Sequence, residues 1–344
     1  MTSTAAPIGP RRPDNAPMGE FELLARLRER LPPPGPQVRL GMGDDAAVTV
    51  PAGATATSVD AIVEGVHFRR DRASLRSIGR KGLATALSDL AAMGAAPGEA
   101  YVILGIPADL DEDGALEVLD GIGEQALATG TALAGGDVTR SPALSLSFTV
   151  VGHAAAPEQL VARGGAAPGD RIVVTGELGG AAAGLLLLEQ DELAPAVPEQ
   201  LSAALLRRQL DPVPRLAEGR ALAAAGARAM IDLSDGLGAD AGHIAAASSV
   251  QMRIEVAALP VCAGVREVAA ASGVDPGQLA AAGGEDYELL ACVPADRLAE
   301  AVSAVAAVGG TSLTPIGEVV AGEGVELRLP DGGRLAPGGF DQLR

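Results

Sequence analysis

Residues 77–106 read SIGRKGLATALSDLAAMGAAPGEAYVILGI and contain a helical pattern followed by a strand pattern. Leu83, Leu87 and Leu90 recur at helical spacing, which predicts a helix over residues 77–93, and the apolar run 101–106 predicts a strand. Asp89 lies off the apolar stripe, so we expect its carboxylate to face a cavity. The adjoining helix and strand patterns indicate an α/β (α+β) fold.

Similar patterns continue on both sides of this stretch. The other elements predicted for the first half are a helix over 20–31, strands over 38–40, 46–50 and 54–59, a helix over 114–128 and a strand over 144–151. Residues 135–137 form a predicted turn region, and an Ala-, Gly- and Pro-rich crossing segment precedes a second set of strands that begins at residue 171. We therefore expect a disordered leader over residues 1–18, an N-terminal domain over 19–153 and a C-terminal α+β domain over 154–344.

The balance of charged residues is acidic, because 44 Asp and Glu against 26 Lys and Arg give a formal net charge of −18 over 344 residues. We therefore expect neither nucleic acid nor a membrane surface as a partner. The apolar stretches are shorter than the roughly 20 residues that cross a bilayer. Residues 1–17 lack the apolar core of a signal peptide, so a cytoplasmic location is expected.

Aspartates in Gly-rich or strand-end contexts are the most informative feature. They are Asp44, Asp45, Asp60, Asp89, Asp137, Asp232 and Asp235. Two carboxylates about 4 Å apart repel by roughly 4 kcal/mol at an effective dielectric constant near 20, so a site that gathers them needs cations. Carboxylate oxygens together with substrate phosphates suit Mg²⁺. For any one of these residues, a role in a turn or a helix cap is the alternative.

Common phosphate-binding and hydrolytic motifs are missing from the sequence. No Gly-x-x-x-x-Gly-Lys-Ser/Thr loop occurs, and Lys81 is the only lysine. None of the three histidines precedes Arg-Asp, which excludes the protein-kinase signature, and no Gly-x-Ser-x-Gly elbow occurs. The turn at residues 176–180 could hold an anion at a helix N-terminus, with close packing as the alternative role of its glycines.

Six short motifs follow one another in a characteristic order. They are Gly41-Met42-Gly43-Asp44-Asp45-Ala46, Ser58-Val59-Asp60 with His67-Phe68 after it, Leu87-Ser88-Asp89-Leu90-Ala91-Ala92-Met93-Gly94, Gly135-Gly136-Asp137-Val138-Thr139-Arg140, Ile231-Asp232-Leu233-Ser234-Asp235-Gly236-Leu237 and Gly283-Gly284-Glu285-Asp286-Tyr287-Glu288-Leu289. Each motif is weak by itself. Together, in this order and with compatible spacing, they resemble the thiamine-monophosphate kinase family from residue 19 to the C-terminus.

This resemblance implies a two-domain aminoimidazole ribonucleotide synthetase-like fold in which each domain is a mixed sheet flanked by helices. It also implies that ATP, as co-substrate, phosphorylates thiamine monophosphate to thiamine diphosphate by direct in-line transfer, assisted by Mg²⁺ in a cleft between the domains. The N-terminal domain would bind metal and ATP and join two chains into a homodimer. The alternatives are another ATP-dependent synthase of the superfamily and a non-catalytic sensor of nucleotide or thiamine phosphate.

The resemblance also implies roles for single residues. The implied metal ligands are Asp45, Ser58, Val59, Asp60, Asp89, Asp137, Asp232 and Asp235. Of these, the expected catalytic residues are Asp60, Asp89, Asp137 and Asp232. The implied contacts to the nucleotide or its metal are Gly136, Asp137, Arg163, Ser234 and Asp235, and the implied contacts to the acceptor are His67, Glu285 and Phe340. Without the resemblance, His67 would be interpreted as a satisfied surface or core histidine and Arg163 as a solvated charge.

The sequence departs from the family at two places. Val59 stands where the family commonly has Thr, so a metal contact there must use the backbone carbonyl. Gln342 and Leu343 stand where the family tail has His and Phe, whereas Phe340 keeps a ring that could cover the thiamine. The expected chemistry suits an acid-rich site, because a phosphate monoester with a second pKa of about 6 is mostly a dianion at pH 7 and needs no general base.

Overall fold

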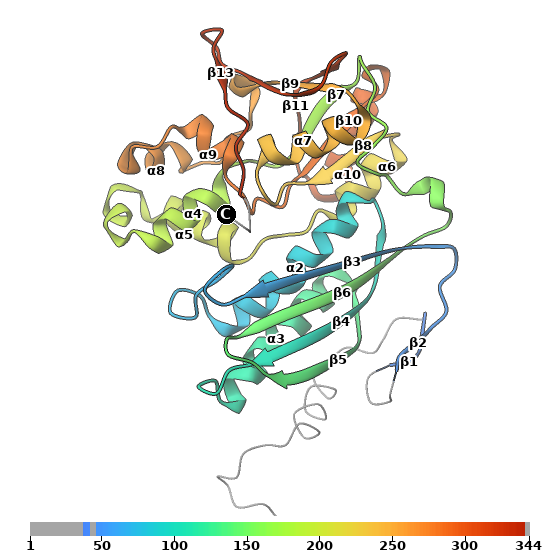
Figure 1. Cartoon of the computed structure of the whole chain (residues 1–344), viewed down its shortest axis with the longest axis vertical. Helices are drawn as coiled ribbons and strands as arrows, with labels where there is room; N and C mark the ends of the chain where they lie inside the picture. Colours follow the sequence, from blue (N-terminus) through green and yellow to red (C-terminus); the bar gives the residue numbers. More distant parts are fainter. Residues whose placement is uncertain (1–36, 42–45, 341–344) are drawn as a thin grey trace, which may run out of the picture.

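The computed structural model describes residues 37–41 and 46–340 and contains two α/β units, one above the other in Figure 1. The predicted leader over residues 1–18, the predicted helix over 20–31 and the Asp44-Asp45 pair lie outside the described residues. Within the described ranges, no helix is long and apolar enough to cross a membrane.

The first unit is built on a four-stranded sheet with the order β3-β6-β4-β5. Its strands are β3 (Ala54–Val63), β4 (Ala96–Ile106), β5 (Ala132–Arg140) and β6 (Ser145–Ala154). β4 and β5 run parallel and the other pairs antiparallel, so the sheet is mixed. A small sheet of β1 (Val38–Leu40) and β2 (Val48–Thr49) lies against β5.

One face of this sheet is covered by α2 (Leu75–Ala92) and α3 (Glu112–Thr129) (Figure 1). α2 begins after Ser74, whose side chain accepts the backbone N–H of Ser77 at 3.1 Å and so caps the helix. The two helices approach backbone to backbone, because a Cβ atom at Gly79 would lie 2.1 Å from the carbonyl oxygen of Val118. This contact sets the position of α2 in the first unit.

The other face of the sheet is open over β3 and β4. Val59 of β3 is 71% exposed on this face, and Ile103 of β4 is also exposed. Because successive side chains of a strand alternate between faces, Ser58 and Asp60 point to the face that carries α2. The motif Ser58-Val59-Asp60 is therefore divided between the two faces of the sheet.

The second unit is built on a seven-stranded sheet with the order β13-β12-β9-β11-β7-β10-β8. Its strands are β7 (Arg171–Thr175), β8 (Ala229–Asp232), β9 (Gln251–Glu255), β10 (Leu289–Val293), β11 (Leu313–Val320), β12 (Gly324–Arg328) and β13 (Arg334–Leu335). Its helices are α4 (Gly180–Glu189), α5 (Glu199–Leu210), α6 (Leu216–Ala224), α7 (Leu237–Ser248), α8 (Val265–Ser272), α9 (Pro276–Ala282) and α10 (Leu298–Gly309).

This second sheet is also mixed, because β12 runs parallel to β9 while the other neighbouring strands are antiparallel. Two mixed sheets with flanking helices confirm the predicted α/β fold with two domains. The predicted domain limits after residues 18 and 153 remain predictions.

The two units share part of their apolar core. Leu90 of α2 lies in the same buried cluster as Met230 of β8. α6 packs directly on α2, since a Cβ atom at Gly219 would lie 2.1 Å from the carbonyl oxygen of Ala91. This packing holds the last turns of α2, which include Asp89, against the second unit.

Residues 135–137 differ from the sequence prediction. They form part of β5 rather than a turn, and Gly135 pairs with Tyr101 while Gly136 pairs with Val102. Glycine is a poor strand former, which is why the prediction was wrong. The strand needs glycine here, because a Cβ atom at Gly136 would lie 2.2 Å from the carbonyl oxygen of Val102.

Candidate active site

A cavity of about 250 Å³ lies between the two units. β3 and α2 of the first unit face α4, α5 and the segments that follow β8 and precede β10 in the second. The cavity is lined by Asp60, Ala61, Ile62, Val66, His67, Thr85, Asp89, Ala182, Leu185, Gln209, Asp232, Ser234, Asp235, Gly284, Glu285, Tyr287 and Phe340. Among these, the residues predicted from the sequence are Asp60, His67, Asp89, Asp232, Ser234, Asp235, Glu285 and Phe340.

The first unit contributes two carboxylates to the cavity wall. Asp60 belongs to β3, and its Oδ1 accepts the backbone N–H of Ala61 at 2.8 Å. Asp89 belongs to α2, and its Oδ2 accepts a hydrogen bond from the Ser58 hydroxyl. Burial raises the pKa of Asp89, the Ser58 hydrogen bond opposes this, and the charge of Asp60 adds to the increase.

Asp232, the last residue of β8, adds a third carboxylate. It is 4% exposed, and its burial, together with the charge of Asp89, raises its pKa to about 7. Three elements far apart in the sequence thus bring Asp60, Asp89 and Asp232 to one cavity. Their oxygens and the Ser58 hydroxyl are hard donors that fit Mg²⁺, whose charge would offset the burial and the repulsion that raise the pKa values of Asp89 and Asp232.

The turn after Asp232 carries Ser234 and Asp235, and Asp240 fixes its shape. Asp240 Oδ2 accepts the backbone N–H groups of Ser234 at 3.1 Å, Asp235 at 3.2 Å and Gly236 at 3.0 Å. Burial raises the pKa of Asp240 to about 7, and the charges of Asp232 and Asp235 add to the increase. Asp240 lies in the first turn of α7, and its carboxylate binds the three N–H groups of the turn that leads into that helix.

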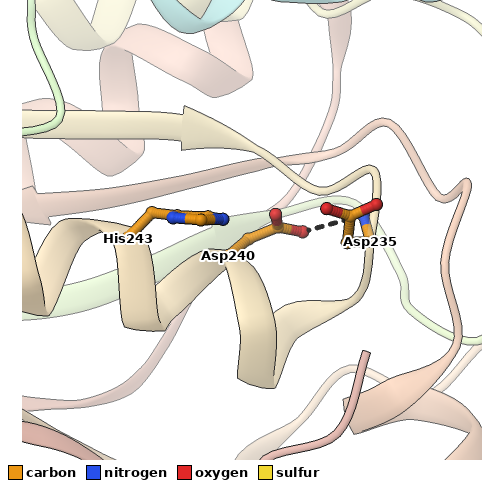
Figure 2. Close-up of side chains that lie close together, drawn as sticks. All are labelled: Asp235, Asp240 and His243. Atoms are coloured by element: carbon orange, nitrogen blue, oxygen red, sulfur yellow. Dashed lines mark hydrogen bonds between the residues drawn. The ribbon is translucent and has the colours of Figure 1, made fainter. Parts of the chain in front are cut away.

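Figure 2 shows the Asp240 carboxylate between Asp235 and His243. One ligand atom from each of these three side chains lies within 4.8 Å of the others. Asp240 Oδ2 already accepts three backbone N–H groups, and His243 is exposed. The cluster therefore supports the turn, and we assign no metal centre to it.

A second carboxylate binds N–H groups at the N-terminus of α4. Asp286 Oδ2 accepts the backbone N–H of Gly179 at 2.7 Å, and its Oδ1 accepts that of Ala181 at 3.2 Å. Burial raises the pKa of the Asp286 carboxyl to about 7, against these two hydrogen bonds. The glycine turn at residues 176–180, which the sequence offers as an anion site, thus holds a carboxylate of the chain itself.

Glu285 is held by two side chains at the cavity. Its Oε1 lies 2.7 Å from Lys81 Nζ, and its Oε2 accepts a hydrogen bond from Gln209 Nε2 at 2.5 Å. Glu285 and Tyr287 have φ values of +64° and +49°, which side chains with a Cβ rarely adopt. The Glu285 N–H donates to the Ser234 carbonyl at 2.8 Å, so this strained segment is tied to the turn after Asp232.

His67 reaches the cavity from the segment after β3, and Phe340 reaches it from the segment after β13. His67 Nδ1 accepts the backbone N–H of Val63 at 3.1 Å, which orients the imidazole. The Phe340 N–H donates to the Asp235 carbonyl at 3.0 Å, so this end of the described chain is anchored beside the cavity. The Phe340 side chain is 57% exposed and free to cover a ligand.

Asp137 lies apart from this cavity, on β5. Across the sheet, the register partners at this level are Asp137 of β5, Ile103 of β4, Ser147 of β6 and Ala61 of β3. Asp137 is therefore level with Ala61, the neighbour of Asp60, and separated from it by three strand spacings, about 14 Å. The structure does not bring Asp137 together with the other predicted ligands, and its role stays a prediction.

Four more predicted residues within the described ranges do not line the cavity: Ser58, whose hydroxyl donates to Asp89, and Val59, Gly136 and Arg163. Gly136 lies on β5, and the Val59 side chain points to the open face of the first sheet. Arg163 is exposed in the segment between the units, and its charge only partly opposes the burial that raises the pKa of Asp89. Asp45 lies outside the described residues.

Sequence reasoning missed Lys81 and Gln209. Lys81, Thr85 and Asp89 are spaced at i, i+4 and i+8 on α2 and so share one helix face, which could have placed Lys81 beside Asp89. Gln209 has no such signal, because α5 is positioned by its packing on α4 and not by its own pattern.

Comparison with known proteins gives two family models that match most of the chain. Residues 43–154 match the model "AIR synthase related protein, N-terminal domain", and residues 167–330 match "AIR synthase related protein, C-terminal domain". The thiamine-monophosphate kinase of Mycobacterium tuberculosis (strain ATCC 25618 / H37Rv) is 39% identical over 297 residues, covering 85% of this chain and 86% of the relative.

Two solved structures are similar over most of their length. The thiamine-monophosphate kinase from Stenotrophomonas maltophilia K279a superposes with a TM-score of 0.79 at 38% identity, covering 91% of this chain and 96% of the other. AaThiL, complexed with AMPPCP and TMP, superposes with a TM-score of 0.73 at 31% identity, covering 83% and 86%.

Proposed function

Since the chain belongs to the thiamine-monophosphate kinase family, we propose that it transfers the γ-phosphoryl group of ATP to thiamine monophosphate, giving thiamine diphosphate and ADP. The AaThiL complex with AMPPCP and TMP supports both substrates. Within this chain, the observation that carries the proposal is the convergence of Asp60, Asp89 and Asp232 in one cavity between the units.

These three carboxylates would hold Mg²⁺, which when bound offsets the negative charge of the phosphates. The Ser58 hydroxyl donates to Asp89 Oδ2 and thereby orients that carboxylate. Asp232 supports a role for a cation, because its burial, together with the charge of Asp89, raises its pKa to about 7 and so penalises the ionised carboxylate.

The proposed transfer breaks the bond between the γ-phosphorus and the bridging oxygen of ADP and forms a bond to an oxygen of the acceptor phosphate. The acceptor phosphate is already mostly a dianion at pH 7, so no proton has to be removed from it. The chain must therefore position two phosphates in line and keep water out. The reaction needs no base, and the site is consistent with this, because the only lysine of the sequence, Lys81, is already paired with Glu285.

The remaining family roles are part of the same proposal. The family resemblance supports all of these roles. The roles of five residues are also supported by their position in the cavity wall: Ser234, Asp235, His67, Glu285 and Phe340. The proposed nucleotide contacts are Gly136, Asp137, Arg163 and Ser234, and the proposed acceptor contacts are His67, Glu285 and Phe340. The further proposed metal contacts are Asp45, the Val59 carbonyl, Asp137 and Asp235.

A homodimer joined through the first sheet is also proposed. Its support is the open face of that sheet, where Val59 and Ile103 expose apolar side chains that a second copy would cover. Light scattering after size exclusion should give the mass of a dimer, and Val59→Glu should shift it toward the monomer. A monomeric wild type at micromolar concentration would contradict this interface.

The use of ATP favours the cytoplasm as the location.

The proposed activity is tested by measuring ADP release from the purified protein. ADP should form when thiamine monophosphate and Mg²⁺ are both present, and thiamine diphosphate should appear in equal amount. Unphosphorylated thiamine should not serve as acceptor, because it lacks the dianionic phosphate. No turnover with thiamine monophosphate, or an equal rate with thiamine, would overturn the proposal.

A further inference from the structure

The α4–α5 side of the cavity contributes apolar groups and one amide. Ala182 and Leu185 of α4 line it, together with Gln209 of α5. α5 comes this close because α4 has a glycine at position 184, where a Cβ atom would lie 2.3 Å from the Leu205 carbonyl oxygen and 3.0 Å from Gln209 Cβ. Helix packing therefore sets Gln209 at the cavity wall.

Charge fixes the orientation of the Gln209 amide. Its Nε2 donates to Glu285 Oε2 at 2.5 Å, and a carboxylate can only accept, so the amide nitrogen must face Glu285. Glu285 is itself held by Lys81, which is 3% exposed and places its Nζ 2.7 Å from Oε1. Lys81 and Glu285 together leave the amide oxygen as the group available for another partner.

The amide oxygen of Gln209 has no hydrogen-bond partner among the described residues. Gln209 is 3% exposed, and its Oε1 is buried without a hydrogen bond to any of residues 37–41 and 46–340. A buried acceptor without a donor destabilises the folded state, so such atoms are rare in proteins. Since Gln209 is part of the cavity wall, a small shift of its side chain would bring this oxygen to a donor carried by a ligand.

We propose that Gln209 Oε1 accepts a hydrogen bond from the amino group on the pyrimidine ring of the acceptor substrate. This inference rests on the proposed function, in which that substrate is thiamine monophosphate. The molecule has a phosphate, a thiazolium cation and an aminopyrimidine, and the amino group is its N–H donor. Ala182 and Leu185 suit a heterocycle, whereas the carboxylates of the opposite elements suit the phosphate through bound cations.

The inference is tested with two ligands and two proteins. Isothermal titration calorimetry measures the dissociation constants of thiamine monophosphate and of an analogue in which hydrogen replaces the amino group. The wild type should bind thiamine monophosphate about 2- to 13-fold more tightly, the equivalent of about 0.5–1.5 kcal/mol for one neutral hydrogen bond. In Gln209→Met, which has no amide oxygen, the ratio of the two constants should fall to about 1.

Leu185→Ala is the matched control, because it removes apolar contact from the same wall and leaves the amide in place. It should weaken both ligands and keep the wild-type ratio. Gln209→Asn is the second variant should Gln209→Met fail to fold, and its shorter amide should also bring the ratio to about 1. A wild-type ratio of 1, or an unchanged ratio in the Gln209 variants, would overturn the inference.

The nucleotide also carries an amino group, so the same titrations compare ATP with purine riboside triphosphate, which lacks it. The ratio of the dissociation constants of these two nucleotides should be equal in wild type and Gln209→Met. A change in that ratio would assign Gln209 to the nucleotide instead. A wild type that turns over thiamine monophosphate but shows no preference for its amino group refutes only the role of Gln209. A wild type that neither binds nor phosphorylates thiamine monophosphate refutes the proposed function as well.

Discussion

Asp232→Asn should stabilise the metal-free protein at pH 8 while it abolishes phosphoryl transfer. The pKa of Asp232 lies near 7 instead of its ordinary 3.8, and each unit of difference corresponds to about 1.36 kcal/mol. Ionising this carboxyl therefore costs about 4 kcal/mol more in the folded protein than in the unfolded chain. The folded state holds the proton more tightly, so the cost is absent below pH 4, grows as the pH rises and is complete above pH 7.

Urea unfolding in EDTA at pH 5 and pH 8 measures this effect. The gain in free energy of unfolding of Asp232→Asn over wild type should be about 3 kcal/mol larger at pH 8 than at pH 5. Asp296→Asn is the matched control, because Asp296 is exposed and its replacement removes the same charge. Mg²⁺ should then stabilise wild type more than Asp232→Asn. An Asp232→Asn protein that is no more stable than wild type at pH 8 would refute the reasoning from burial.

Three further substitutions test the surroundings of the cavity by steady-state kinetics. Asp240→Ala should reduce turnover more than Asp240→Asn, because alanine leaves three backbone N–H groups without an acceptor; equal losses would contradict this. Phe340→Ala should raise the Michaelis constant for thiamine monophosphate about 5- to 150-fold, since covering the ring is worth about 1–3 kcal/mol. A lower melting temperature with both Michaelis constants unchanged would instead make Phe340 an anchor of the tail. Lys81→Met should raise the Michaelis constant for thiamine monophosphate, because Glu285 loses its cation, and Lys81→Arg should recover part of the loss; an effect on ATP alone would count against it.

The position of Asp89 was predictable because a local rule decides it. An amphipathic helix buries its apolar stripe, so an acidic residue off the stripe has to lie where the helix is not covered by core. The structure confirms that Asp89 faces a cavity. The meeting of Asp89 with Asp232 depends on packing between the two units, and only the family resemblance pointed to it.

Non-local contacts explain what the sequence did not predict. Gly135 and Gly136 have the composition of a turn, yet pairing with β4 makes them a strand. Gln209 is an ordinary polar residue in the pattern of α5, and the absence of a side chain at Gly184 brings it to the cavity. Lys81 was predictable only in part. The helical spacing places it on the same face as Asp89, but its partner, Glu285, is more than 200 positions away in the sequence.

The backbone N–H groups near the cavity bear on why the proposed site would bind phosphate through carboxylates and cations. A glycine-rich turn at a helix N-terminus usually binds phosphate directly. In this chain Asp286 binds two N–H groups at the start of α4, and Asp240 binds the three N–H groups of the turn that leads into α7. These internal anions hold Ser234 and Glu285 in place without a ligand, but they deny the N–H groups to a phosphate. In the proposed function, cations would therefore meet the substrate phosphates, and the meeting of Asp60, Asp89 and Asp232 at one cavity is the feature that would bind those cations.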